Sequence, residues 1–556
     1  MKRIIILVLA LTALLPIAAQ ESKHNAEVNK QLEIFNNLYR QLDMYYVDTL
    51  DAKKNIENAL LYMLAQLDPY TTYFSEDKTG DLKQMTTGKY AGIGSTISYN
   101  NEADRCVIAE PYKDMPAATY GLRRGDIILS IDGKDMGVCG KQEKSEYSSK
   151  VSNALRGEPG STFTLVVKRP CVADSLSFQI KRKAIALPSV TYSGIISDSV
   201  GYVLLDGYTE HTSRDLRLAF DDLKQRGAKR LVLDLRINGG GLMLEAVNVV
   251  NLFIPRGYEV VSTKGKLKEM SATYKTRKEA WDTEIPVVVL TDFGTASAAE
   301  ITSGALQDYD RAVIVGRRTY GKGLVQQSRP VTGLAALKLT TSKYYIPSGR
   351  CIQAYEFKNG VPQHLADSLS KEFRTANGRV VRDGGGITPD IMVEADSFPN
   401  LLSYLEMSEA LFKYSAEYRN THDKIAEPSK FHISDKEYEE FKAFLKKEKF
   451  TYDRQSRNAL DLLRKIATRE GYADVAKAEF DSLEAKLIHN EEYDYKIWEK
   501  EIRRIVDMSI LRTYYFEQGA VEYFLPHDKD LQKALEVLCN DKQYRDILAS
   551  PKKKKK

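Results

Sequence analysis

The chain has 556 residues, of which 43% are hydrophobic and 28% are charged, and this composition is ordinary for soluble globular proteins. The length is too great for a single hydrophobic core and predicts about three or four domains. The formal net charge of +5 matches the five lysines at residues 552–556. The rest of the chain is therefore near neutral, and its charge gives no argument for nucleic-acid binding.

The first twenty residues have the pattern of a secretory signal peptide. Residues 1–3 form a short segment that is basic because of Lys2 and Arg3. Residues 4–15 then form an almost unbroken apolar run, and small residues follow up to Gln20. That order predicts export to the periplasm or cell envelope, because the apolar run is too short to span a membrane. The alternative is an uncleaved anchor. The five cysteines form no CxxC pair, and an odd number leaves at least one of them unpaired within the chain.

Two segments with different patterns follow. Residues 21–80 are predicted to be helical, with apolar residues near a 3.6-residue period and a second helix at 54–67 that ends before Pro69. Residues 81–184 consist of short apolar runs separated by glycine and proline turns, which predicts a small β-rich domain.

The remainder divides into an α/β core and a helical region. From 185 to 395, buried strands alternate with helices, which is typical of an α/β fold. From 396 to 556 the chain is charged and helical, and Ser434 with Glu437 forms a capping-box pattern. It ends in the polylysine run, which is either a solvated tail or a contact for an anionic membrane surface.

Ser297 is a candidate nucleophile. A predicted buried strand at 286–291 leads through a loop of small residues to a helix that starts near Ser297. Backbone N–H groups at a helix start are unpaired and carry partial positive charge, so the Ala298 N–H could stabilise an oxyanion. The alternative is purely structural, because Ser297 and Glu300 also fit a capping box.

Lys322 is a candidate general base. It lies between two glycines after a predicted buried strand at 312–315. A lysine acts as a base only when it is neutral, which burial favours, and Ser–Lys pairs are a known variant of triad chemistry. Gln326 could orient its amine by a hydrogen bond. The alternative is a surface lysine in a glycine turn.

Two further glycine-containing patterns bear on function. Residues 316–322 match most of the phosphate-binding motif GxxxxGK[ST], but Gly323 replaces the hydroxyl residue and 324–330 lack a helical pattern, so nucleotide binding is disfavoured. The glycines at 239–241 end a hydrophobic strand, and Gly240 and Gly241 are candidate oxyanion donors. The alternative is a turn without a ligand. No HExxH motif or His/Asp cluster supports a metal site, and His211 is read as a surface or packing residue.

Together these segments resemble the carboxy-terminal processing peptidases, or tail-specific proteases, over residues 32–393. In the N-terminal half the resemblance rests on LDPYTTYF, YAGIG, GLRRGDIILSIDG and LRGEPGSTFTLVVKR. In the core it rests on LDLRINGGG, TASAAEITSGALQD, GRRTYGKGLVQ, LKLTTSKYYIPSGRCIQ and GGITPDI.

The resemblance implies a serine endopeptidase without a cofactor, with Ser297 as nucleophile, Lys322 as base and Gln326 as its partner. It places oxyanion donors on Ala298 and on the glycine turn. One departure is Gly239, where the family usually has proline, so which glycine donates stays open. It also implies a multidomain α/β protein: a crotonase-like α/β protease core, an inserted PDZ-like domain, an N-terminal helical segment and a C-terminal helical extension.

The resemblance further implies how substrates bind. The PDZ carboxylate loop falls on Tyr90, Ala91, Gly92, Ile93 and Gly94, whose N–H groups would capture the C-terminus of a protein or peptide that adds as a strand. The C-terminal helical region lies outside the shared motifs and is a candidate surface for a homo-oligomer or an adaptor. Two other functions stay open: a non-catalytic PDZ scaffold or chaperone on a protease-like core, and crotonase-like acyl chemistry on a small molecule, which export and the PDZ insertion disfavour.

Overall fold

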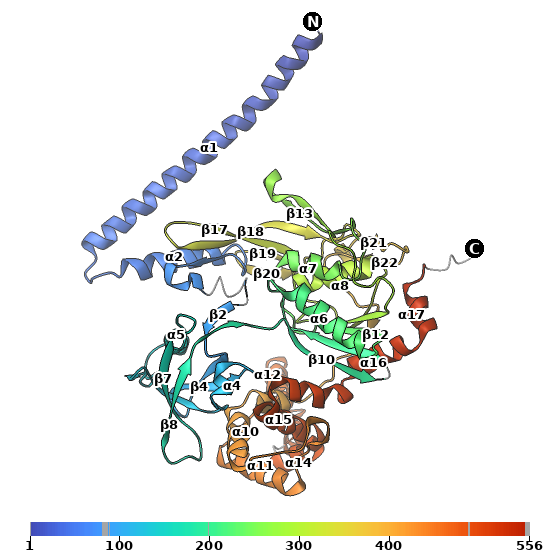
Figure 1. The fold of residues 1–556 in the computed structure, drawn as a ribbon. Helices are drawn as coiled ribbons and strands as arrows, with labels where there is room; N and C mark the ends of the chain where they lie inside the picture. Colours follow the sequence, from blue (N-terminus) through green and yellow to red (C-terminus); the bar gives the residue numbers. More distant parts are fainter. Residues whose placement is uncertain (1, 81–86, 88, 198, 488–489, 551–556) are drawn as a thin grey trace. The chain divides into compact units, whose positions relative to one another are not determined.

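A computed structural model describes residues 2–80, 87, 89–197, 199–487 and 490–550. The chain divides into two compact units. The first contains the N-terminal residues up to Thr79 with Gln326–Leu339 and Phe357–Pro362, and the second contains the rest of the chain. Figure 1 follows the chain by colour through these parts. The polylysine run lies outside the described residues.

The first unit is built from two helices and short strand segments. α1 spans Lys2–Tyr45 and α2 spans Ala52–Ala65. Asp51 caps α2 by accepting a hydrogen bond from the Lys54 N–H at 3.0 Å, and α2 ends four residues before Pro69, as the sequence predicts. β1 (Thr72–Phe74) pairs antiparallel with the first residues of β18 (Ala336–Tyr345). Within the described residues, no helix combines the length and apolar character needed to cross a membrane.

The β-rich domain of the second unit is a small antiparallel sheet packed against a helix. Its order is β3-β4-β5-β7-β8. Alternate residues of β7 are buried, as expected for a sheet with one covered face, and α5 buries Tyr147, Val151 and Leu155 in the same core. The elements are β2 (Lys89–Gly92), β3 (Ser95–Asn100), β4 (Arg105–Pro111), α4 (Pro116–Thr119), β5 (Ile127–Ile131), β6 (Lys134–Asp135), α5 (Lys144–Leu155), β7 (Thr162–Lys168), β8 (Ser175–Lys181) and β9 (Lys183–Ala186).

The α/β core is a six-stranded sheet in the order β10-β11-β12-β15-β16-β23, parallel except for the β10–β11 pair. β15 and β16 are buried along their whole length and β11 at every residue but Leu204, because both faces of the sheet are covered. The elements are β10 (Val190–Ser197), β11 (Val200–Leu205), α6 (Thr212–Gln225), β12 (Arg230–Asp234), α7 (Met243–Val250), β15 (Val287–Thr291), α8 (Ala298–Asp308), β16 (Val313–Gly316) and β23 (Ile391–Met392).

The two faces are covered by different parts of the chain. Helices α6, α7 and α8 pack on one face through side chains such as Phe220, Val250 and Leu306. The other face is covered by α16 (Lys529–Cys539), whose Leu531, Ala534, Val537 and Leu538 pack on strand residues of β11, β12, β15 and β16. The C-terminal helical region therefore completes the core of the sheet (Figure 1).

The rest of the C-terminal region is a helical domain with its own core, which includes Leu405, Phe441, Val506 and Ile510. Ser434 and Glu437 form the predicted capping box at the start of α11. The helices are α9 (Asn400–Glu406), α10 (Glu409–Thr421), α11 (Asp435–Lys447), α12 (Gln455–Glu470), α13 (Lys477–Lys486), α14 (Glu491–Ile497), α15 (Glu499–Phe524) and α17 (Asp541–Leu548).

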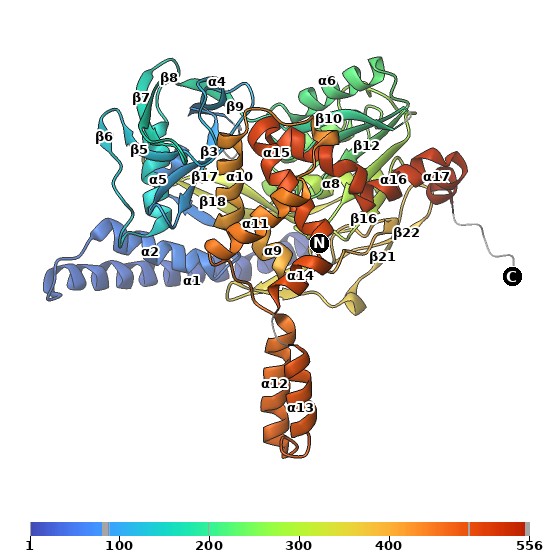
Figure 2. The same ribbon diagram turned by 90° about the horizontal axis from the view of Figure 1, so that it is seen from below.

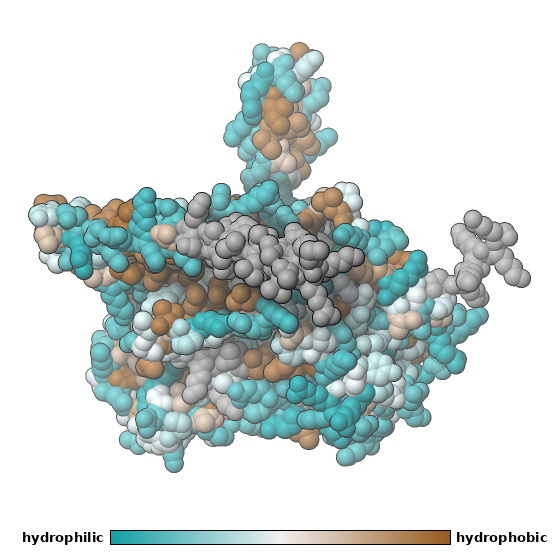
Figure 3. All heavy atoms as spheres, turned by 90° about the horizontal axis from the view of Figure 1, so that it is seen from above, coloured by the Kyte–Doolittle hydropathy of each residue, from teal (hydrophilic) through white to brown (hydrophobic). Residues whose placement is uncertain are grey.

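Helices α12 and α13 form a hairpin that extends away from the other helices of this domain (Figure 2). Its core is small, with Leu460, Ala467 and Phe480 as the buried residues. Apolar surface is visible on the hairpin in Figure 3. The exposed apolar residues of the hairpin are Leu462, Leu463, Ile466, Tyr472, Val475 and Leu483.

The chain contains further short strands and 3-10 turns. They are η1 (Glu76–Lys78), β13 (Glu259–Gly265), η2 (Lys268–Met270), β14 (Ala272–Lys275), β17 (Leu324–Pro330), β19 (Tyr355–Lys358), β20 (Val361–His364), η3 (Asp367–Leu369), β21 (Glu372–Arg374), β22 (Val380–Arg382), η4 (Pro428–Lys430) and η5 (Leu525–His527). All five cysteines are free thiols in this structure.

Candidate active site

Ser297 occupies a strained position between β15 and α8. Its backbone angles are φ 58° and ψ −116°, whereas an ordinary helix-capping residue has extended angles. A non-glycine residue in such a conformation costs on the order of 1–3 kcal/mol and persists only where the surroundings enforce it. The preceding loop does so, because one oxygen of Asp292 accepts the N–H groups of Ile237 and Gly294, each at 2.9 Å.

Glu300 joins the Ser297 turn to the Lys322 loop. Its carboxylate is fully buried and accepts four hydrogen bonds. Oε2 accepts the Ser297 N–H at 2.8 Å and the Lys322 N–H at 2.9 Å. Oε1 accepts the Gly321 N–H at 2.7 Å and the Thr319 hydroxyl at 2.6 Å. The backbone nitrogens of Ser297 and Lys322 are therefore close enough to share one oxygen atom.

Burial raises the pKa of Glu300 above its ordinary value, and the four hydrogen bonds act in the opposite direction. Every one of these four groups is a donor, and a carboxylate is the acceptor-only form of glutamate. The ionised form is thus the one that satisfies all four contacts. The capping-box interpretation of Ser297 is correct in so far as Glu300 accepts the Ser297 N–H, but the same carboxylate also holds the Lys322 loop.

The Lys322 loop is fixed on both sides by backbone and side-chain contacts. The Gly323 N–H donates to the side chain of Gln353 at 2.7 Å, and the Ala354 N–H donates to the Gly321 carbonyl at 2.9 Å. Tyr344 connects this loop to the Ser297 turn: its N–H donates to the Gly323 carbonyl at 2.9 Å and its hydroxyl to the Ser297 carbonyl at 3.2 Å. Burial raises the pKa of Tyr344 well above its ordinary value, so its hydroxyl stays a donor.

The glycine turn after β12 lies directly against the Ser297 turn. A Cβ atom added to Gly240, which has φ +90°, would lie 2.7 Å from the Ala298 nitrogen and 2.8 Å from the Ser297 Cβ. Asn238, fully buried, accepts the Gly240 N–H at 2.9 Å through its side chain and the Ala296 N–H at 2.9 Å through its carbonyl. Only such a close approach lets one oxyanion contact donors from both turns.

The N–H groups of the candidate oxyanion residues differ. That of Gly240 is already used by Asn238. Among the described residues, the N–H groups of Ala298 and Gly241 donate no hydrogen bond. A helix start leaves such donors available, so Ala298 and Gly241 have the free N–H groups that an oxyanion needs, and Gly240 provides the close approach.

The predicted carboxylate loop lies at one end of an open sheet edge. Tyr90, Ala91 and Gly92 are on β2, paired with β9, and Ile93 and Gly94 lead into β3. In the described part of the domain β3 is an edge strand whose sheet neighbour is β4. Such an edge accepts an extended peptide by strand addition. The Arg156 guanidinium, at the end of α5, lies 5.9 Å from the centre of the Tyr90 ring and places positive charge near this loop.

Three matches place this chain among known proteins. Residues 199–365 match Peptidase family S41, residues 107–169 match a PDZ domain, and residues 401–538 match the C-terminal helical domain of a probable PDZ-protease. The chain is 35% identical over 390 residues to the carboxy-terminal-processing protease of Bartonella bacilliformis. The aligned region covers 69% of this chain and 80% of that protein.

The chain belongs to the carboxy-terminal processing proteases of peptidase family S41. Two other relatives agree. Identity is 31% over 361 residues with carboxy-terminal processing protease CtpB of Bacillus subtilis, covering 64% of this chain and 71% of that protein. Identity is 33% over 340 residues with a probable CtpA-like serine protease of Staphylococcus aureus, and the aligned region covers 61% of this chain and 66% of that protein. The protein is thus a serine protease with a PDZ domain, and the predicted α/β fold class is confirmed.

The structure of this protease also separates the alternatives left open by the sequence. The phosphate-binding alternative at 316–322 is contradicted, because strand β17 and not a helix follows Gly323. His211 is partly buried just before α6, and Gln326 lies on β17. Among the described residues, no group of three or more His, Cys, Asp and Glu side chains is placed to hold a metal ion.

Sequence reasoning missed three residues of the candidate site. The sequence pattern identified Glu300 only as a cap. The contacts that join Asn238 and Tyr344 to the Ser297 turn have no local signal, because Asn238 accepts the Ala296 N–H from 58 residues away and Tyr344 donates to the Ser297 carbonyl 47 residues away. Asn238, in the stretch NGGG, could have been noticed as the polar residue that opens the glycine turn.

Proposed function

We propose that this protein is an exported endopeptidase in which Ser297 is the nucleophile and Lys322 the general base, and that it selects substrates by their C-terminal tails. The observation that carries the proposal is the buried carboxylate of Glu300, which accepts both the Ser297 and the Lys322 N–H groups. One rigid anchor thereby fixes the relative position of the two backbone segments that carry the reacting side chains, which supports proximity catalysis.

The chemistry follows from these roles. The Ser297 Oγ attacks the carbonyl carbon of the scissile peptide bond while the neutral Lys322 amine takes the hydroxyl proton. The carbonyl π electrons move to oxygen, where the Ala298 and Gly241 N–H groups stabilise the negative charge. Collapse breaks the C–N bond, and Lys322 gives its proton to the leaving amine. A water molecule, deprotonated by Lys322, then hydrolyses the acyl-enzyme and restores the Ser297 hydroxyl.

Tail recognition is supported by the open edge of β3 and by the names of the relatives, which describe carboxy-terminal processing. A peptide added along β3 would direct its terminal carboxylate toward the loop from Tyr90 to Gly94, where Arg156 supplies positive charge. Proteins and peptides are the substrates of this proposal, and their C-termini are the recognised feature.

The test is cleavage of an unfolded protein with an apolar C-terminus. Wild type should cut it, whereas Ser297→Ala and Lys322→Ala should lose at least about 1,000-fold in kcat/KM while still binding the tail peptide. Cleavage by purified Ser297→Ala would refute the mechanism. Tail binding by all three proteins without cleavage by wild type would favour the scaffold alternative.

Export is tested separately. The basic, apolar and small-residue order of residues 1–20 supports a cleaved signal peptide. Cell fractionation followed by N-terminal sequencing of the mature protein should find it in the periplasm or cell envelope, starting near residue 20. A cytosolic protein that retains Met1 would contradict export.

A further inference from the structure

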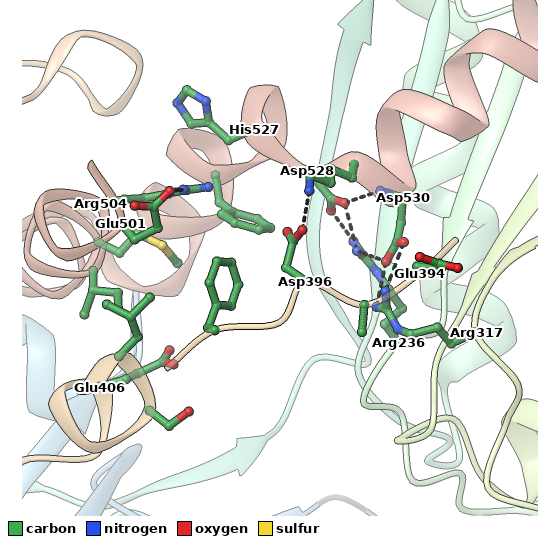
Figure 4. A pocket seen from close by; sticks show the side chains of 18 residues that line it. Arg236, Arg317, Glu394, Asp396, Glu406, Glu501, Arg504, His527, Asp528 and Asp530 are labelled. Carbon is green, nitrogen blue, oxygen red and sulfur yellow. Dashed lines mark hydrogen bonds and ion pairs between the residues drawn. The ribbon is translucent and has the colours of Figure 1, made fainter. Parts of the chain in front are cut away.

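Two aspartates at the start of α16 contact the α/β core where its catalytic loops begin. Asp528 and Asp530 are almost fully buried. The Arg236 guanidinium donates to Asp528 Oδ1 and to Asp530 Oδ2, each at 3.0 Å. Arg317 donates to the two oxygens of Asp530 at 3.2 Å and 2.7 Å. Figure 4 shows both arginines directed at this pair of carboxylates.

Each of the two arginines lies at the start of one loop of the candidate site, Arg236 before the glycine turn and Arg317 before the Lys322 loop. Arg236 follows β12 and lies two residues before Asn238, the residue that opens the glycine turn. Arg317 follows β16 and precedes Lys322 by five residues. Both therefore lie at the carboxyl edge of the parallel sheet, where ligand and catalytic sites of α/β folds are built.

Arg317 is also tied to the strand that leads to Ser297. Its N–H donates to the Thr291 carbonyl at 2.8 Å, and the Thr291 hydroxyl donates to the Arg317 carbonyl at 3.0 Å. Thr291 is the last residue of β15, six residues before Ser297. One acidic residue of α16, Asp530, thus contacts side chains that continue into the glycine turn and the Lys322 loop.

The charged groups of this cluster are largely buried, and Arg236 contacts a third carboxylate as well. Arg236 also donates to Asp234 at 3.0 Å, and its side chain is 16% exposed while that of Asp234 is 1% exposed. Burial alone would lower the pKa of Arg236, but Asp234 and Asp528 outweigh it and raise that pKa. Two arginines therefore face three carboxylates, and removal of a carboxylate leaves a buried guanidinium with fewer partners.

We propose that Asp528 and Asp530 are positioning residues for peptide hydrolysis: through Arg236 and Arg317 they hold the glycine turn and the Lys322 loop in register with Ser297. The inference rests on the proposed function and adds a role for the C-terminal helical region. Catalysis then depends on the docking of α16, and anything that moves α16 changes the turnover of the site.

The surroundings of these two arginines and two aspartates allow their role to be tested without loss of core packing. Arg236, Arg317, Asp528 and Asp530 line a cavity of about 510 Å³ together with residues of the helical domain such as Leu402 and Met508. Water can occupy space left beside the polar groups, so a variant that lacks one charge need not lose its core packing. Asp528 also caps α16 by accepting the Asp530 and Leu531 N–H groups, and asparagine keeps a capping oxygen.

The chain offers a matched control at the other end of the same strand. Asp541, at the start of α17, accepts a hydrogen bond from Arg230 at 3.0 Å. Arg230 is the first residue of β12, so this ion pair also joins a C-terminal helix to the core but lies away from the catalytic loops. Asp541→Asn should leave kcat within about twofold of wild type.

The experiment compares wild type, Asp528→Asn, Asp530→Asn, the double variant, Asp530→Glu and Asp541→Asn on a short peptide substrate. Each single Asn variant should lose roughly 10-fold in kcat and the double variant roughly 100-fold, with KM within about threefold, because only transition-state contacts are misplaced. Affinity for a peptide boronate, which mimics the tetrahedral intermediate, should fall in parallel. Tail-peptide binding to the PDZ domain should not change, and Asp530→Glu, which keeps the charge, should recover part of the kcat.

Three results would overturn the inference. These are a double variant with wild-type kcat, a loss of kcat matched by Asp541→Asn, and a fall in kcat with unchanged boronate affinity. Failure of the proposed function looks different, because wild type itself would then not cleave or Ser297→Ala would cleave as well.

Discussion

Glu300 is the residue on which the geometry of the candidate site depends most directly. Its four hydrogen bonds come from the Ser297 turn and from the segment between Thr319 and Lys322. A buried carboxylate that accepts four hydrogen bonds has no acceptor position left, and solvent water cannot take over these contacts. Two residues 25 positions apart in the sequence are thereby held by one side chain.

Glu300→Gln should reduce kcat/KM by roughly 10- to 100-fold, because loss of hydrogen bonds to a charged group costs about 1.5–3 kcal/mol. The amide nitrogen would face N–H donors and displace one of the two turns. The matched control is Glu437→Gln, which changes the same capping-box position at the start of α11 in the helical domain. Steady-state cleavage assays on both variants decide the matter, and equal losses would mean that the effect is not local.

The raised pKa of Glu300 gives a prediction for stability. The pKa of Glu300 in the folded protein lies above the ordinary value of 4.5, which applies to the unfolded chain. At a pH between these two pKa values, Glu300 keeps its proton in the folded protein and has released it in the unfolded chain. The contribution of this group to the free energy of unfolding therefore decreases as pH rises through that interval and is constant above it. Urea unfolding in a Ser297→Ala background should show that the stability advantage over Ser297→Ala/Glu300→Gln is smaller at pH 8 than at pH 4.5. An advantage that grows with pH would contradict the shift.

At the scale of elements, the glycine turn after β12 and the start of α8 form one surface. Gly240 tolerates no side chain, because an added Cβ would lie within 2.6–2.8 Å of Ala296, Ser297 and Ala298 atoms. Gly239, its neighbour, has no atom within 4 Å of an added Cβ. Adjacent glycines in one turn thus have different physical reasons for being glycine.

Gly240→Ala should lower kcat by about 100-fold, since strain of roughly 3 kcal/mol must be relieved by moving the two turns apart. Gly239→Ala, the control one residue away, should retain activity within about threefold. Active-site titration with a serine-reactive probe, together with kcat, measures both. A Gly240→Ala protein with normal kcat would show that the close approach has no part in catalysis.

The edge of β3 belongs to the same scale. If the proposed tail-binding loop from Tyr90 to Gly94 binds a carboxylate through its backbone N–H groups, a peptide with a free C-terminus should bind the Ser297→Ala protein at least about 10-fold more tightly than the same peptide with an amidated C-terminus. Fluorescence anisotropy with labelled peptides measures the ratio. Equal affinities would mean that the tail carboxylate is not recognised.

At the scale of the whole chain, the C-terminal region is part of the catalytic core. α16 places Leu531, Val537 and Leu538 on the sheet, and burial of three such side chains contributes on the order of 5–9 kcal/mol. That is comparable to the entire stability of a typical domain, about 5–15 kcal/mol. The helical region and the sheet therefore have to fold as one structure.

A chain that ends at His527 should be insoluble or inactive, because one face of the sheet would lose its cover. A chain that ends at Ser550 keeps α16 and α17 and should have wild-type activity and melting temperature. Thermal unfolding and cleavage assays on the two truncations test this. An active, folded protein that ends at His527 would show that the sheet does not need α16.

Much of the fold could be predicted from local patterns. Continuous apolar runs bounded by turns predict strands at 201–205, 230–235 and 286–291, and the ends of the observed β11, β12 and β15 lie within one residue of these bounds. The 26-residue helix α15 and the cover that α16 gives to the sheet were not predicted. Helix α15 packs against α9 and α10 in the core of the helical domain, and α16 packs on the α/β sheet. These partners are far away in the sequence, so no short-range pattern predicts them.

By itself, the sequence determined the family, the order of its parts and the residue types at the candidate site, because these depend on local motifs such as TASAAE and YGKG. Only the tertiary structure decided that Glu300 holds two loops, that Gly240 rather than Gly239 is sterically required, and that Asp528 and Asp530 contact Arg236 and Arg317. The physical reason is separation along the chain: hydrogen bonds and contacts between residues that are tens to hundreds of positions apart arise only when the chain is folded.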